Sequence, residues 1–120
     1  MLVVEDEPIN QEVVKFLLEE IGLEVDLAGD GMEAVALARQ HSYALILMDL
    51  QMPKMTGIDA SKEIQLLRGH EATPIIATTA NAFAEDRAAC LAAGMSDYLS
   101  KPFEPDRLFT MLLKWLSKGR

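Results

Sequence analysis

The stretch "ALILMDLQMPKMTG", residues 44–57, decides the fold, because a run of apolar residues ends there in a single carboxylate, Asp49. A continuous apolar run of this length is typical of a strand in the middle of a parallel sheet, where both faces are covered. Pro53 and Gly57 follow and break regular structure, so the chain is expected to turn away sharply after the carboxylate. The pattern predicts a buried central strand over 44–48 that holds Asp49 at its carboxyl end.

Similar strand-like segments alternate with helical patterns along the whole chain. The expected strands are 2–4, 24–28, 44–48, 74–79 and 97–100. The expected helices are one that follows the first strand and ends at Gly22, one over 31–40 capped by Asp30 and Glu33, one after Gly57, one over 83–93 ended by Gly94, and one from Pro105. Five strand–helix units in sequence predict an open parallel sheet with helices on both faces.

Apolar residues at helical spacing predict which face each helix buries. The expected buried residues are Ile9, Val13, Phe16, Leu17 and Ile21 in the first helix, Ile58, Ile64 and Leu67 after Gly57, and Leu108, Met111, Leu112 and Trp115 in the last helix.

Composition excludes several classes of function. The 120 residues fit one domain, and the net charge of −8 with scattered Lys and Arg argues against nucleic-acid binding. No apolar run approaches the roughly 20 residues that span a membrane, so we expect no membrane contact by this chain. Cys90 is the only cysteine, so no internal disulfide can form, and a cytoplasmic setting is favoured. Cys90 itself is expected to be a core residue.

Polar residues stand at the expected strand ends, where open parallel sheets bind their ligands. They are Glu5, Asp6, Asp49, Thr79 and Lys101. Three carboxylates repel one another unless a cation lies between them, and oxygen-only donors favour a hard divalent ion such as Mg²⁺. Asp49 can attack phosphorus, with Lys101 neutralising charge and Thr79 donating a hydrogen bond. The set therefore suits formation of an aspartyl phosphate.

The blocks "VVEDE", "MDLQMPKMTG", "IATTANA" and "YLSKPF" resemble the signature blocks of response-regulator receiver domains, in order and over essentially the whole chain. The resemblance implies a doubly wound (βα)5, flavodoxin-like α/β fold whose five-stranded parallel sheet has the order 2-1-3-4-5. It also implies phosphorelay signalling, in which Mg²⁺ (or Mn²⁺) supports phosphoryl transfer from a phosphohistidine on a partner. Such a chain catalyses its own phosphorylation and dephosphorylation and turns over no independent substrate.

The same resemblance assigns roles to particular residues. Asp49 is the phospho-acceptor, assisted by Thr79 and Lys101. Glu5, Asp6, Asp49 and the carbonyl of Gln51 are the metal ligands, with Glu5 standing where many receivers have Asp. Thr79 and Tyr98 form the switch that biases the face built from the fourth helix, the fifth strand and the last helix.

The resemblance names a sensor histidine kinase, a histidine phosphotransfer domain, or both as partners, and the chain itself is expected to be a monomer or weak dimer. His41 and His70 stand among polar residues near helix ends, so the donor histidine is expected on the partner. The opening "VEDEPINQ" is most similar to receivers of hybrid sensor histidine kinases. Residues 1–120 are therefore expected to be a single receiver domain from a larger, membrane-anchored protein.

Three other functions are alternatives to this one. An aspartate-nucleophile phosphatase would want a second Asp where Gln51 stands. A flavodoxin-like cofactor binder would want a phosphate-cradling loop where the chain has the acidic "EDEPIN". A receiver-like adaptor that is not regulated by phosphorylation remains the main alternative, although the complete set of Asp6, Asp49, Thr79 and Lys101 argues against it.

Overall fold

A computed structural model describes residues 1–50, 57–67, 69, 73–79, 88, 91–100 and 104–118. Its strands are Leu2–Val4 (β1), Asp26–Ala28 (β2), Ile46–Asp49 (β3), Ile75–Thr79 (β4) and Asp97–Ser100 (β5). Its helices are Pro8–Glu20 (α1), Gly31–Gln40 (α2), Gly57–Gln65 (α3) and Pro105–Lys118 (α5). The expected helix over 83–93 falls largely outside the described residues. Within the described ranges, no helix is both long and apolar enough to cross a membrane.

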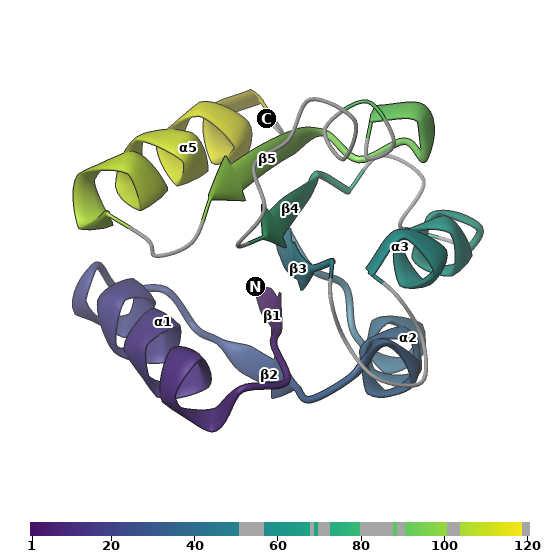
Figure 1. Ribbon diagram of the computed structural model, residues 1–120, viewed down its shortest axis with the longest axis horizontal. Helices are drawn as coiled ribbons and strands as arrows, with labels where there is room; N and C mark the ends of the chain where they lie inside the picture. Colours follow the sequence, from purple (N-terminus) through teal and green to yellow (C-terminus); the bar gives the residue numbers. More distant parts are fainter. Residues whose placement is uncertain are drawn as a thin grey trace.

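The five strands form one parallel sheet in the order β2-β1-β3-β4-β5, which confirms the expected fold class and topology. Helices α1 and α5 cover one face of the sheet, while α2 and α3 cover the other (Figure 1). Strand β3 lies between β1 and β4, so its side chains are buried on both faces. This position explains why the apolar run before Asp49 is continuous rather than alternating.

Successive strand residues supply two separate cores, because their side chains point to opposite faces of the sheet. Val3, Leu47 and Ile76 pack with residues of α1 and α5, namely Val14, Leu18, Leu108 and Leu112. Leu2, Val4, Ile46 and Met48 pack with residues of α2 and α3, namely Ala34, Val35, Ala38, Ala60 and Ile64. The predicted inward residues of α5 are therefore confirmed at Leu108 and Leu112.

The predicted buried face of α1 is wrong except at Leu17, which packs against the core. Val14 and Leu18 are its buried residues, whereas Ile9 and Phe16 are 69% and 63% exposed. Val13 and Ile21 are also exposed, and Leu17 is partly buried. The error arose because α1 is apolar on more than one side, and spacing alone does not tell which stripe meets the sheet. Gly22 does end the helix as expected, with a φ of +86° just past the cap.

Gly57 allows α3 to begin directly against the end of β3. Its N–H donates to the Leu50 carbonyl at 3.3 Å, and Leu50 N–H donates in turn to the Thr78 carbonyl at 3.0 Å. A Cβ placed on Gly57 would collide with the Asp49 carbonyl oxygen and would lie 2.9 Å from Leu50 Cα. The missing side chain is therefore what lets the helix approach the backbone that carries Asp49.

We expect Gly57→Ala to lower the free energy of unfolding by about 1–3 kcal/mol, because the added methyl group overpacks a site closed by backbone. Denaturant unfolding measures this loss, and amide NMR shifts at Asp49 and Leu50 should move with it. Gly22→Ala is the control: nothing lies within 4 Å of its Cβ position, so its cost comes from the φ of +86° alone. Unchanged shifts at Asp49 in Gly57→Ala would contradict this interpretation.

Candidate metal and phosphorylation site

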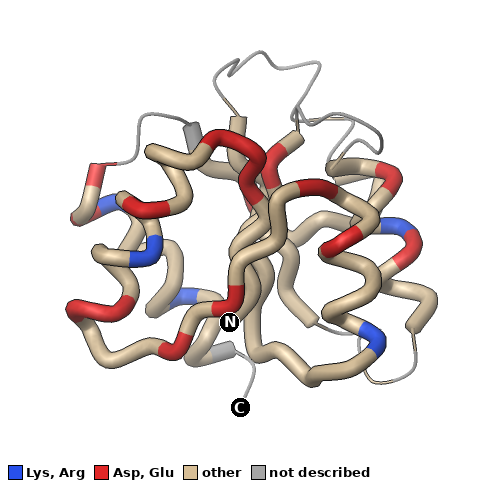
Figure 2. The backbone as a smooth tube through the Cα atoms, turned by 90° about the horizontal axis from the view of Figure 1, so that it is seen from below, with Lys and Arg blue, Asp and Glu red and all other residues tan. Residues whose placement is uncertain are grey.

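Three carboxylates meet at the carboxyl edge of the sheet. Glu5 and Asp6 directly follow β1, Asp49 is the last residue of β3, and these two strands are neighbours with Val4 paired to Met48. One oxygen from each carboxylate lies within 4.8 Å of the others. Glu5 and Asp49 are both 3% exposed, while Asp6 is exposed. Figure 2 shows acidic residues close together at the end of the sheet opposite the N-terminus.

The donor set of this cluster fits a hard divalent cation. All three groups offer carboxylate oxygens, and two of them are almost removed from water, where uncompensated negative charge is costly. Carboxylate oxygens without nitrogen or sulfur donors suit Mg²⁺, Mn²⁺ or Ca²⁺ better than zinc or copper. The cluster could therefore hold a metal ion, as the strand-end pattern predicted.

A short loop, Glu5–Asp6–Glu7, carries two of these carboxylates, and hydrogen bonds fix it at both ends. Glu5 N–H donates to the Ala28 carbonyl of β2 at 3.0 Å, and Glu7 N–H donates to Glu5 Oε2 at 3.3 Å. The Glu7 carboxylate caps α1 by accepting from the amides of Ile9 and Asn10 at 3.1 and 2.8 Å. The loop thus presents Asp6 between a strand end and a capped helix start.

Thr79 is the last residue of β4 and is 1% exposed. The register pairs Thr78 with Asp49 on one side, and Thr79 with Ser100 on the other, so Thr79 lies at the same edge of the sheet as the carboxylates. Lys101 and Gln51, the other two residues predicted for this site, lie outside the described residues. The structure therefore brings together Glu5, Asp6 and Asp49 and places Thr79 at their edge of the sheet.

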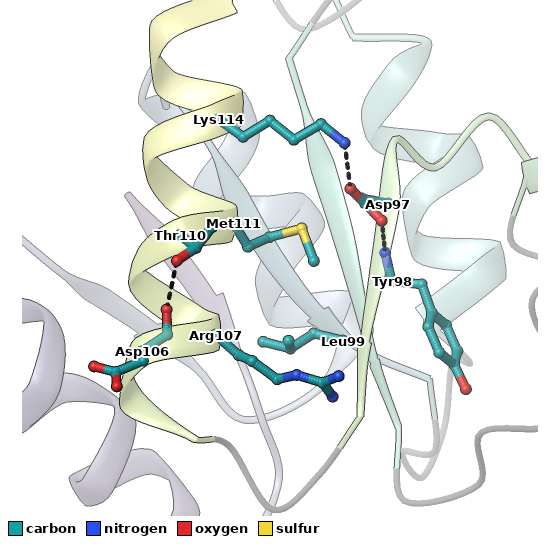
Figure 3. Close-up of a pocket in the computed structure, with 8 residues that line it drawn as sticks. All are labelled: Asp97, Tyr98, Leu99, Asp106, Arg107, Thr110, Met111 and Lys114. Carbon is teal, nitrogen blue, oxygen red and sulfur yellow. Dashed lines mark hydrogen bonds and ion pairs between the residues drawn. The ribbon is translucent and has the colours of Figure 1, made fainter.

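Tyr98, the predicted switch residue, is partly buried in edge strand β5, and its N–H donates to Asp97 Oδ1 at 2.9 Å. Beside it, a cavity of about 570 Å³ opens between β5 and α5. Figure 3 shows Leu99 and Met111 in this cavity, whereas the Tyr98 ring points away from α5. None of the three clustered carboxylates lines the cavity, so it is separate from the candidate metal site.

Asp97 ties β5 to α5 through its second oxygen. Oδ2 accepts from the Trp115 indole N–H at 2.8 Å and from Lys114 Nζ at 3.4 Å. Partial burial raises the pKa of Asp97, but hydrogen bonds from Trp115, Tyr98 and Lys114 outweigh that effect and hold the pKa below its ordinary value. Sequence reasoning missed this contact, since Trp115 was expected only to pack.

Comparison with known proteins agrees with this geometry. The family model of the response regulator receiver domain matches residues 1–113. The histidine-protein kinase BarA of Escherichia coli K12 is 44% identical over 115 residues, which are 96% of this chain and 12% of BarA. The sensor protein GacS of Pseudomonas syringae is 40% identical over 118 residues, which are 96% of this chain and 13% of GacS. The chain thus spans about an eighth of these curated relatives.

Solved structures of similar proteins share the fold closely. One is the receiver domain of the sensor histidine kinase PA1611 from Pseudomonas aeruginosa, described with a magnesium ion coordinated in its active-site cleft. It is 44% identical with a TM-score of 0.91, and the match covers 97% of this chain and 95% of that one. A second similar structure is a co-crystal of the Saccharomyces cerevisiae histidine phosphotransfer protein Ypd1 with the receiver domain of Ssk1. It matches at 31% identity with a TM-score of 0.88, covering 97% of this chain and 87% of the matched chain.

Proposed function

The chain belongs to the family of response regulator receiver domains and acts in two-component signalling; from this premise we propose that it accepts a phosphoryl group on Asp49 from a phosphohistidine of a partner protein. The observation that carries the proposal is the convergence of Glu5, Asp6 and Asp49, with one oxygen of each inside 4.8 Å. We assign Asp49 as the nucleophile because it matches the phospho-acceptor position of receiver domains; it ends the central strand, whereas Glu5 and Asp6 lie in the neighbouring loop.

The transfer step is a simple exchange of bonds at phosphorus. A carboxylate oxygen of Asp49 bonds to phosphorus while the bond from phosphorus to the donor imidazole nitrogen breaks. The electron pair of the broken bond stays on that nitrogen, and the product is an acyl phosphate on Asp49. Burial of Asp49 at a strand end holds its carboxylate in one position, which reduces the entropy lost when the donor binds.

Glu5, Asp6 and Asp49 would hold Mg²⁺, assisted by the carbonyl of Gln51. The bound ion supplies positive charge for the oxygens of the transferring phosphoryl group. We further propose that Lys101 supplies a second positive charge and that the Thr79 hydroxyl donates a hydrogen bond to the phosphoryl group. In this assignment Thr79 also begins the switch, and Tyr98 passes it to the face formed by the fourth helix, β5 and α5.

A histidine phosphotransfer protein is the partner that we propose, since a solved relative, 31% identical, is described together with one. The similarity to BarA and GacS supports the further proposal that residues 1–120 are one receiver domain within a longer, membrane-anchored hybrid kinase. We also propose a cytoplasmic location for the domain, consistent with its single cysteine, and a monomeric or weakly dimeric state.

The proposal predicts that the chain takes phosphate from a histidine donor. A histidine phosphotransfer protein carrying labelled phosphohistidine is mixed with the chain and Mg²⁺, and the label on each protein is followed by gel. We expect the label to move to the chain within minutes and to remain on the donor when EDTA is present. Label that stays on every phosphotransfer protein tried, while acetyl phosphate also fails, would favour the adaptor that is not regulated by phosphorylation.

A further inference from the structure

The Gln11 side chain reaches from the first turns of α1 back to the loop that carries the metal-binding carboxylates. Gln11 Nε2 donates to the carbonyl oxygen of Glu5 at 2.5 Å, across six residues of chain. The backbone N–H of Gln11 makes the first helical bond of α1 by donating to the Glu7 carbonyl at 3.0 Å. Gln11 is partly buried, and its amide also faces the loop after β2, 3.9 Å from the Cβ position of Gly29.

The bond to Glu5 matters because the Glu5 N–H still pairs with the Ala28 carbonyl of β2, whereas the Glu5 carbonyl lies past Val4, the last residue of β1. The Glu5 carbonyl and the Asp6 N–H belong to one planar peptide unit, and a hydrogen bond at one end of that plane fixes the direction of the other. The rotation of this plane sets where the Asp6 side chain leaves the backbone. The Gln11 bond to the Glu5 carbonyl therefore also restrains the backbone from which the Asp6 side chain leaves.

Asp6 needs such support more than the other two carboxylates do. Asp49 is held within β3, and the Glu5 carboxylate accepts a hydrogen bond from the Glu7 N–H at 3.3 Å. Asp6 is exposed and lies in the loop between β1 and α1. Its position thus depends on the backbone of the loop, which is fixed on one side by the helix cap at Glu7. On the other side it is fixed by the bond from Glu5 N–H to the Ala28 carbonyl and by the bond from Gln11 to the Glu5 carbonyl.

We propose that Gln11 is a positioning residue for the metal site, which orients the Glu5–Asp6 peptide and so raises affinity for Mg²⁺. The inference rests on the proposed function, because it takes Asp6 as a ligand. Outer groups that orient metal ligands typically contribute 10- to 100-fold to metal affinity. The Gln11 bond acts through backbone rather than on the ligand itself, so we expect an effect at the lower end, about 10-fold.

The test compares Gln11→Met with Gln65→Met. Methionine matches glutamine in length but has no N–H donor, so each variant loses the same kind of bond. Gln65 is a matched control: it is also partly buried on a helix, and its Nε2 donates to the Gly94 carbonyl at 2.6 Å, in a loop that holds none of the three carboxylates. Mg²⁺ affinity is measured by calorimetry, and the melting temperature is measured in EDTA.

Both variants should melt a few degrees lower, since each loses one hydrogen bond. Gln11→Met alone should bind Mg²⁺ about 10-fold more weakly. An unchanged Mg²⁺ affinity in Gln11→Met, or an equal loss in Gln65→Met, would overturn the positioning role. Asp6→Asn separates the two proposals: if it abolishes Mg²⁺ binding while Gln11→Met does not weaken it, only the inference fails. If the unsubstituted chain binds no Mg²⁺, the proposed function fails with it.

Discussion

The Asp49→Asn variant should gain no phosphoryl group from acetyl phosphate in the presence of Mg²⁺, whereas the unsubstituted chain should gain one. Asparagine keeps the size and shape of the side chain, but its amide is not a nucleophile toward phosphorus. The variant should be at least as stable as the unsubstituted chain in EDTA, because it removes one of three mutually repelling carboxylates. A melting temperature in EDTA no lower than that of the unsubstituted chain would exclude unfolding as the cause of lost phosphorylation.

Intact mass spectrometry at a series of times measures this result. Asp59→Asn is a suitable control, because Asp59 is an exposed carboxylate in the first turn of α3 and is not one of the clustered three. It should gain one phosphoryl group at the rate of the unsubstituted chain. If Asp49→Asn gained a phosphoryl group at that same rate, the acceptor would be another residue.

Removing the metal should have the second largest effect. We expect EDTA, or the Asp6→Asn substitution, to slow phosphorylation of Asp49 by about 100- to 1000-fold, the range seen when one preorganised charge-stabilising group is lost from a catalytic site. Without a cation, the remaining carboxylates would also repel the incoming phosphate. Asp6 is exposed, so we expect its replacement to act on the metal site and not on the stability of the fold.

Single-turnover rates with acetyl phosphate, at saturating Mg²⁺ and in EDTA, check this prediction. Asp30→Asn serves as a control, because Asp30 also lies just past the end of a strand, β2, but is used to cap α2. There its Oδ1 accepts from Glu33 N–H at 2.8 Å. Asp30→Asn keeps an oxygen for that cap and should react at the normal rate. Equal rates for Asp6→Asn with Mg²⁺ and for the unsubstituted chain would remove Asp6 from the site.

Much of the fold could be predicted because it depends on patterns that are local in sequence. The apolar run before Asp49 marked the central strand, and Asp30 with Glu33 marked the start of α2. The carboxylates could be brought together in advance, since parallel strands end at one edge of their sheet. The prediction for strand 24–28 was too long, because only Asp26–Ala28 pairs with β1.

What could not be predicted depends on how elements pack. The exposed stripe of α1, with Ile9 and Phe16, is as apolar as the side that faces the sheet, so the pattern alone favoured the wrong face. The hydrogen bonds of Gln11 to Glu5 and of Trp115 to Asp97 join residues whose distance is set by helix placement. No pattern in the sequence distinguishes Gln11 and Trp115 from other polar or aromatic residues on their helices.

The position of the phosphoryl group tests the central claim most directly. The phosphorylated chain is reduced with borohydride, which converts an aspartyl phosphate to homoserine, and is then digested and sequenced by tandem mass spectrometry. We predict a single converted residue, Asp49, in the unsubstituted chain treated with acetyl phosphate and Mg²⁺. Conversion at Glu5 or Asp6 in place of Asp49, or no conversion at any residue, would contradict the account.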